Sequence, residues 1–66
     1  MKISVSRIKI FRIKNRRGYA ALCQSHLTEG KTIFEAYARM LKALRRSKVT
    51  VTGNLTNIKR LLVSMD

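Results

Sequence analysis

The chain has 66 residues, of which 15 are Lys or Arg and three are Asp or Glu, so its net charge is +12. This length predicts one domain, residues 1–66, because so short a chain cannot divide its apolar residues between two cores. The apolar content of 45% is typical of a folded protein and too high for a disordered basic tail.

The excess of positive charge is the most unusual property of the sequence. No acidic residue precedes Glu29. Repulsion among like charges opposes folding, and a polyanion that neutralises them relieves it. Nucleic acid, either DNA or RNA, is the commonest such partner. No segment is long and apolar enough to enter a membrane, whereas the small core leaves a homodimer or a partner that covers apolar surface open.

The cysteine content and the amino-terminal residues bear on the compartment. Cys23 is the only cysteine, so neither an internal disulfide nor a thiolate zinc site is possible. The first fourteen residues, MKISVSRIKIFRIK, carry charges where a secretory signal needs an unbroken apolar run. We expect a protein of the reducing cytoplasm.

The first segment, Lys2–Lys14, is rich in Ile and Val, which favours a β-strand. The parity of its apolar residues changes twice along the segment. A strand with one buried face then needs irregularities, which we expect near Ser6–Arg7 and near Ile10–Phe11. The alternative is a strand that is covered on both faces.

The residues Asn15–Gly18 are typical of a turn. We expect a second strand over Tyr19–Leu27, although Ala20–Leu22 would suit a helix equally well. The preceding glycine and the short distance to Thr32 favour a hairpin. The residues Thr28–Lys31 then form the turn into the next element.

The segment Thr32–Ser47 is predicted to be an amphipathic helix. The Thr32 hydroxyl can accept from the Glu35 N–H, and the Glu35 carboxylate from the Thr32 N–H, as in a capping box. The expected apolar stripe consists of Ile33, Tyr37, Met40, Leu41 and Leu44, with Phe34 at its edge. The opposite face consists of Glu35, Arg39, Lys42, Arg45 and Arg46, and Glu35 can pair with Arg39 four residues later.

The residues Lys48–Thr52 alternate and predict a short strand that ends at Gly53-Asn54. A second helix is expected to begin at Asn54 or Thr56. Its apolar side would consist of Leu55, Ile58, Leu61, Leu62 and Met65.

These elements predict an α+β fold with the order β-β-α-β-α. A right-handed crossover through the helix gives a three-stranded antiparallel sheet in the order 2-1-3. The first helix would cover one face of this sheet through Ile33, Phe34, Tyr37, Leu41 and Leu44. The carboxyl-terminal helix would extend that layer or contact a second subunit.

Residues 18–45 resemble the hairpin-helix module of the HicB-like antitoxin family. The resemblance consists of Gly18-Tyr19 at the start of a strand and of Gly30-Lys31-Thr32 with Glu35-Ala36 at the start of a helix. In that family the module binds a small basic toxin, and a separate carboxyl-terminal element binds operator DNA. The loop between strand and helix is shorter here than in the family.

Two groups of basic residues are candidate nucleic-acid contacts. The hairpin group is Arg7, Lys9, Arg12, Lys14, Arg16 and Arg17. Such a hairpin can follow a phosphate backbone, or its charges can simply protect a strand edge from aggregation. The absence of nearby acids favours binding.

The helix group is Arg39, Lys42, Arg45 and Arg46 with the neighbouring Lys48. Within it, Arg39, Lys42 and Arg46 form an i, i+3, i+7 row that can contact successive phosphates. Alternatively, cations near the end of the helix complement its dipole. If the helix packs as expected, its basic face lies away from the hairpin tip. Tyr19 and Phe11 could stack on bases, but a place in the core is the simpler expectation.

No residue pattern predicts catalysis. Cys23 and His26 are three apart in a predicted strand, so we expect their side chains on opposite faces. The three acids form no pair for acid–base chemistry, and the isolated glycines form no phosphate-binding loop. We therefore predict a non-enzymatic protein without cofactor or metal.

The sequence thus predicts a small nucleic-acid-binding protein. The alternative is a regulator or inhibitor, of the kind common in phages and mobile elements, that docks on an acidic surface of a host protein complex. An antitoxin-type binder is the third possibility.

Overall fold

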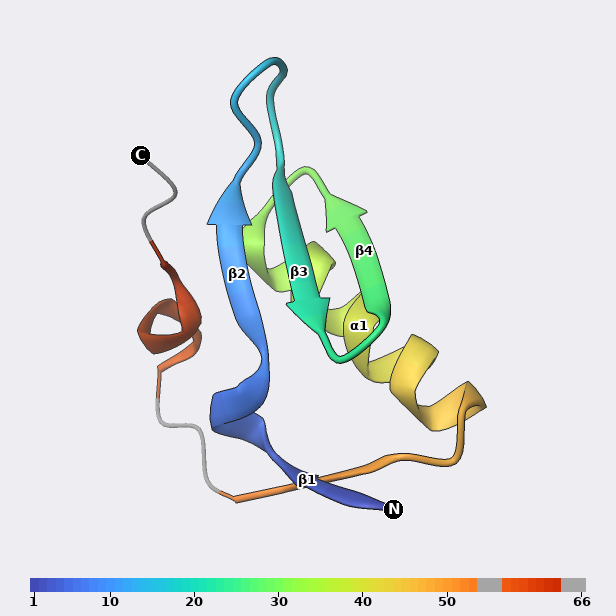
Figure 1. The fold of residues 1–66 in the computed structure, drawn as a ribbon. Coiled ribbons are helices and arrows are strands. Elements are labelled where there is room, and N and C mark those ends of the chain that lie inside the picture. Colours follow the sequence, from blue (N-terminus) through green and yellow to red (C-terminus); the bar gives the residue numbers. More distant parts are fainter. Residues whose placement is uncertain (54–56, 64–66) are drawn as a thin grey trace.

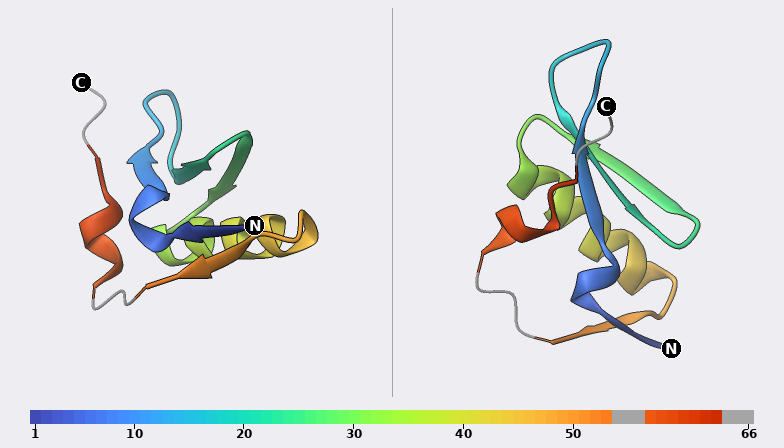
Figure 2. Two further views of the ribbon diagram at one scale, coloured as in Figure 1. Left: turned by 60° about the horizontal axis from the view of Figure 1, so that its bottom comes forward. Right: turned by 60° about the vertical axis from the view of Figure 1, so that its left-hand side comes forward.

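The computed structural model describes residues 1–53 and 57–63, and in it a sheet and a helix form two layers (Figure 1). The strands β2 (Lys9–Arg12), β3 (Tyr19–Cys23) and β4 (His26–Gly30) form an antiparallel sheet in the order β2-β3-β4. The helix α1 (Ile33–Arg46) covers one face of this sheet, and the other face is open (Figure 2). The predicted α+β class, with a three-stranded antiparallel sheet and one main helix, is confirmed.

The first predicted strand is divided by a turn of 3₁₀-helix, η1 (Val5–Arg7). The irregularity expected at Ser6–Arg7 is therefore present, and it separates β1 (Lys2–Ser4) from β2. The irregularity expected near Ile10–Phe11 was wrong, because β2 continues through both residues. Ile10 is buried and the next side chain is half-buried, so apolar residues of both parities fit one strand.

The prediction of a single second strand over Tyr19–Leu27 was also wrong, since this segment contains β3 and the start of β4, joined by a tight turn. Gln24 begins this turn with a φ of 54°, and the pairing of Cys23 with His26 closes it. The expected turn over residues 28–31 is mostly strand, because β4 continues to Gly30, which pairs with Tyr19. The turn at Gln24-Ser25 lacks the Gly, Asn or Asp by which such turns are recognised.

The additional strand changes the topology that follows it. It reverses the chain once more before α1, so the strand after the helix runs opposite to the expected direction. That strand, β5 (Thr50–Thr52), pairs in parallel with β1 through Lys2↔Thr50 and Ser4↔Thr52. The third predicted strand thus lies beside the first segment, as expected, but it pairs in parallel and in a separate two-stranded sheet. The prediction of one antiparallel sheet in the order 2-1-3 was therefore wrong, because the three-stranded sheet has the order β2-β3-β4.

The predicted helix is present and its amino-terminal cap is largely as expected. The Thr32 hydroxyl accepts from the Glu35 N–H at 3.1 Å. The Glu35 carboxylate, however, accepts from the Lys31 N–H at 3.1 Å and not from that of Thr32. Gly30 brings β4 close to this first turn, since a Cβ at residue 30 would lie 2.5 Å from the Ala36 nitrogen.

The core lies between α1 and the strands. Its helical members are Ile33, Ala36, Met40 and Leu44, and they pack with Ile8, Ile10, Ala21 and Cys23, among others. Tyr37 and Leu41 are half-buried at its border. The expectation that Phe34 covers the sheet was wrong, because its side chain is 63% exposed. The small Ala36, which faces the sheet in its place, allows the close approach to β4.

The predicted carboxyl-terminal helix is represented among the described residues by one 3₁₀ turn, η2 (Ile58–Leu61), which Asn57 caps. Within this segment Leu61 is buried. The Val63 N–H donates to the Ile10 carbonyl at 2.8 Å, and Leu62 forms a parallel bridge to Ile10. This segment therefore lies along the outer edge of β2. The expected helix starts at Asn54 or Thr56, and the expected contacts of Leu55 and Met65, fall outside the described residues.

Candidate nucleic-acid interface

The loop between β2 and β3 extends past the end of the sheet (Figure 1). The Ile13 N–H donates to the Gly18 carbonyl at 3.1 Å and closes the loop. Gly18 has a φ of 131°, which strongly favours glycine. Four basic residues around this loop are exposed: Arg12, Lys14, Arg16 and Arg17. We call residues 13–18 the hairpin loop.

Glu29 joins the hairpin loop to the helix. Its carboxylate forms an ion pair with Arg16, and its backbone carbonyl accepts from Arg39 Nη1 at 3.0 Å. Arg39 also lies 3.4 Å from the Glu35 carboxylate, in the predicted i, i+4 pair. Two arginines from distant parts of the chain are thus held beside the last residues of β4.

A shallow cavity of about 300 Å³ lies at this junction. Its lining consists of Ile13, Arg16, Arg17, Glu29, Gly30, Lys31, Glu35 and Arg39. We call it the tip cavity. The expectation that the basic face of the helix lies away from the hairpin tip was wrong for Arg39. Lys31 was not among the candidate residues, although its position just before the helix cap places it at this end of α1.

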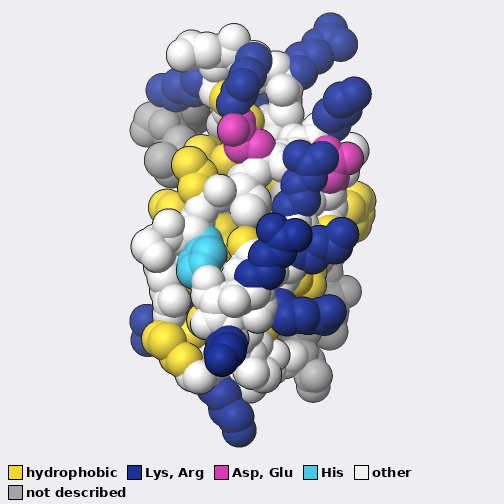
Figure 3. Space-filling model, turned by 90° about the vertical axis from the view of Figure 1, so that its right-hand side faces the viewer, with side chains coloured by type: hydrophobic (Ala, Val, Ile, Leu, Met, Phe, Trp, Pro, Cys, Tyr) yellow, Lys and Arg dark blue, Asp and Glu magenta, His cyan; other side chains and the backbone are white. Residues whose placement is uncertain are grey.

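The other basic residues of α1 continue from the tip cavity along the helix. Lys42, Arg45 and Arg46 are exposed, as is Lys48 beyond the last turn. Figure 3 shows Lys and Arg side chains in a band down this side of the molecule, with acidic side chains near the hairpin end. Two members of the hairpin group, Arg16 and Arg17, therefore meet the helix group at Arg39.

Arg7 and Lys9 lie apart from the hairpin loop. They line a second cavity at the opposite end of β2, together with Ser6, Leu22, Cys23 and Gln24. Arg12 pairs across the strands with Tyr19. The six predicted hairpin residues thus occupy two ends of the sheet and do not form one continuous patch.

Few of these charges are compensated inside the protein. Residues 1–53 and 57–63 contain two acids, Glu29 and Glu35. These acids pair with Arg16 and Arg39. In that part of the chain, no other Lys or Arg has a carboxylate within salt-bridge distance. The basic surface therefore keeps most of its charge.

The predicted relation between Cys23 and His26 was wrong, because the two residues are cross-strand partners and share a face of the hairpin. Burial raises the pKa of the Cys23 thiol, and the positive charge of Arg7 offsets part of this rise. His26 Nε2 lies 2.7 Å from the Ser47 hydroxyl. The thiol thus stays protonated at neutral pH, and this does not favour a nucleophile.

Phe11 and Tyr19 were both expected in the core, and this expectation was right for Tyr19 and wrong for Phe11. Tyr19 is half-buried against the core, on the side of the sheet that faces α1. Phe11 pairs with Ala20, one position further along, and so lies on the opposite face.

No group of three or more His, Cys, Asp or Glu residues in the described part of the chain is placed to hold a metal ion. No helix in it has the length and apolar character needed to span a membrane.

Comparisons with protein families, with curated proteins and with solved structures found no match to this chain.

Proposed function

We propose that this protein binds nucleic acid without catalysis, and that its main phosphate contacts lie at the tip cavity. The observation that carries this proposal is the convergence of Arg16 and Arg17 with Arg39 and Lys31 in one cavity lining. Clustered Arg and Lys side chains on one side of a small domain are the electrostatic signature of nucleic-acid binders.

The ion pairs at the tip cavity are weak enough for phosphate groups to compete with the carboxylates. Carboxylate and phosphate oxygens both accept bidentate hydrogen bonds from a guanidinium group. Arg16 and Arg39 are 64% and 60% exposed in their side chains, and such exposed pairs contribute little stability. A phosphate group can therefore compete with the carboxylates for these arginines with little loss of stability, while the Glu29 backbone carbonyl still accepts from Arg39.

The helix supplies a second set of contacts. Lys42 and Arg46 follow Arg39 on α1 at spacings of three and four residues, so their side chains point to the same side of the helix. A phosphate backbone that starts at the tip cavity can continue along this row. Contacts of this kind fix position without reading bases, so we expect weak dependence on sequence.

The proposal is tested by removing two tip charges. The double variant Arg16→Ala/Arg17→Ala should weaken binding and should flatten the plot of log affinity against log salt by about 1.8 on duplex DNA, since each phosphate contact contributes about 0.9.

The matched control is Lys2→Ala/Lys59→Ala, which removes the same charge from β1 and η2. Equal losses in the two double variants would mean that net charge alone drives binding, and would reject the tip cavity as the site.

The acidic side chains of a protein partner could pair with the same Lys and Arg residues. If a partner from the cell remains bound after nuclease treatment, the function is docking on a host complex. Co-purification with a small toxin would support the antitoxin-type role. If either result is obtained and the protein does not bind oligonucleotides, nucleic-acid binding is rejected in favour of that role.

A further inference from the structure

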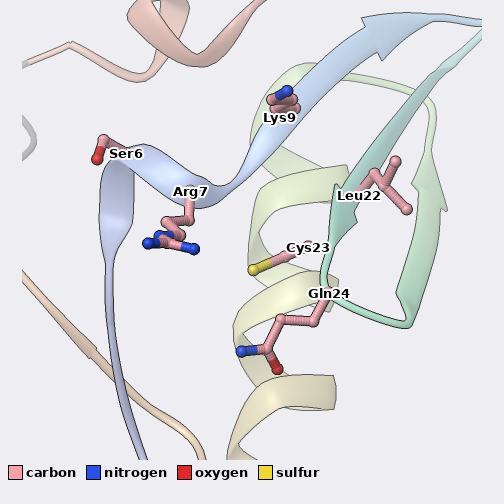
Figure 4. Close-up of a pocket in the computed structure, with 6 residues that line it drawn as sticks. All are labelled: Ser6, Arg7, Lys9, Leu22, Cys23 and Gln24. Atoms are coloured by element: carbon pink, nitrogen blue, oxygen red, sulfur yellow. The ribbon is translucent and has the colours of Figure 1, made fainter.

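The second cavity arises where η1 turns the chain away from the sheet. The pairing of β2 with β3 begins at Lys9↔Leu22, so the last residues of β3 have no neighbour on that side. The space left there has a volume of about 570 Å³. Figure 4 shows Arg7 reaching from η1 into this space, toward Cys23 and Gln24 at the end of β3. We call it the strand-end cavity.

The polar groups of the strand-end cavity suit a ligand that carries a negative charge and also has hydrogen-bond donors and acceptors. Arg7 and Lys9 are both exposed and have no acidic partner in the described parts of the chain. The Gln24 amide supplies two donors and an acceptor, whereas the Ser6 hydroxyl already shares a hydrogen bond of 2.9 Å with the Ser4 hydroxyl. Among the described residues, the one side-chain hydrogen bond of the Gln24 Nε2 is to Met1 Sδ at 3.8 Å, and thioether sulfur is a weak acceptor. The amide is therefore available to a ligand.

The size and the apolar wall of the strand-end cavity indicate a ligand that is larger than a phosphate group. Its volume lies within the range of small-molecule sites, about 300–1,000 Å³. Leu22 lines the cavity from the open face of the sheet and Cys23 from the face toward α1, so Leu22 is the apolar surface on the open side. Leu22 is 41% exposed, and its cross-strand partner Leu27 is 60% exposed, so the apolar surface continues onto the open face of the sheet. A planar base can lie against such a wall.

The two cavities differ in the form of nucleic acid that they suit. The lining of the tip cavity contains acids, arginines and one apolar side chain, Ile13. Such a lining fits the backbone phosphates of any strand. The strand-end cavity adds an amide and an apolar wall without acids. Bases inside a duplex are paired and stacked, so an apolar wall is useful only for unpaired bases.

We propose that the strand-end cavity holds one unpaired nucleotide, with its phosphate at Arg7 and Lys9, its base against Leu22 and its base edge at Gln24. This inference rests on the proposed function and makes it more specific, because it predicts a preference for single strands over duplexes.

The first test uses adenosine 5′-monophosphate and NMR signals of the Gln24 side-chain amide. The nucleotide should shift these signals saturably, and the shift should be lost in Arg7→Ala. If no saturable shift occurs, or if inorganic phosphate alone causes the same shift at the same concentration, the cavity is not a nucleotide site.

The second test compares a single-stranded oligonucleotide with its duplex at fixed salt. Arg7→Ala should weaken single-strand binding about tenfold, as expected for the loss of one hydrogen-bonded charge, and duplex binding at most about twofold. Gln24→Ala should weaken single-strand binding without changing its salt dependence. Lys2→Ala is the control for the lost charge. Equal effects of Arg7→Ala and Lys2→Ala on both oligonucleotides would overturn the inference.

These outcomes separate the two proposals. If oligonucleotides bind and depend on Arg16 and Arg17 but not on Arg7 and Gln24, the strand-end inference alone fails. If the mononucleotide binds but no oligonucleotide does, the proposed function fails and the strand-end cavity stands as a site for free nucleotides.

Discussion

The backbone carbonyl of Glu29 accepts a hydrogen bond from the side chain of Arg39 at 3.0 Å. Arg39 lies in α1 and Glu29 lies in β4, so this bond ties the helix to a strand at the edge of the sheet. The carboxylate of the same Glu29 pairs with Arg16 of the hairpin loop. One acidic residue thus positions cations from two elements on one side of the molecule.

Replacing Glu29 by Gln should strengthen nucleic-acid binding. The substitution removes a carboxylate that competes with phosphate for Arg16. Exposed ion pairs contribute up to about 1 kcal/mol, so affinity should rise by about threefold and the free energy of unfolding should fall by less than about 1 kcal/mol. Fluorescence anisotropy and urea unfolding provide the two measurements.

The control for this substitution is Thr50→Lys, which adds the same charge at an exposed position of β5. If it increases affinity as much as Glu29→Gln does, the effect of Glu29 is one of net charge and not of competition at the tip cavity.

Gly30→Ala should destabilise the fold. The added Cβ would lie 2.5 Å from the Ala36 nitrogen and 2.8 Å from the Glu35 Cβ, so the backbone of β4 or of α1 must move. Overpacking of this kind typically costs about 1–3 kcal/mol. Denaturant unfolding should show a loss in this range, whereas Ser25→Ala, in the exposed turn, should change stability by less than about 0.5 kcal/mol. An unchanged midpoint for Gly30→Ala would show that β4 and α1 are further apart in solution.

Thr32→Ala should remove the helix cap. The Thr32 hydroxyl accepts from the Glu35 N–H, and loss of such a cap typically costs about 1 kcal/mol. Thr32→Ser retains the hydroxyl and should keep most of the stability. If both variants unfold at the same denaturant concentration, the cap contributes nothing.

Cys23 should make stability depend on pH above neutrality. Burial raises the pKa of its thiol, with partial compensation by Arg7, so the unfolded chain ionises at lower pH than the folded protein. The thiol therefore contributes its full stabilisation below the unfolded pKa, and this contribution is lost as pH rises toward the folded pKa.

The check is the stability difference between the native protein and Cys23→Ala, in which the titration of other groups cancels. The substitution should cost less at about pH 10 than at about pH 7.5. An equal cost at both pH values would contradict the raised pKa.

The features that were predicted well are those that depend on neighbouring residues. The α1 helix follows from Thr32, Glu35 and an apolar period of 3.6 residues, all within one segment. The turn at Gly18 follows from a residue that readily adopts positive φ. The break at Ser6–Arg7 follows from a change of parity within one strand.

The features that were missed depend on a turn without recognisable turn residues, or on contacts between residues far apart in the chain. The turn at Gln24-Ser25 carries no glycine or asparagine, so β4 could not be distinguished from its predecessor. Without β4, neither the direction of β5 nor the meeting of Arg16 with Arg39 can be derived. Phe34 was misplaced because the side of α1 that packs on the sheet includes Ala36, which lies against Gly30.

The most direct test of the account is a salt titration of the native protein against duplex DNA, single-stranded DNA and structured RNA. If about six phosphates are neutralised, log affinity for duplex DNA should fall with log salt at a slope of about −5. We expect slopes of that size, with tighter binding to unpaired strands. A slope close to zero on all three nucleic acids would contradict the central claim that the basic surface binds a phosphate backbone.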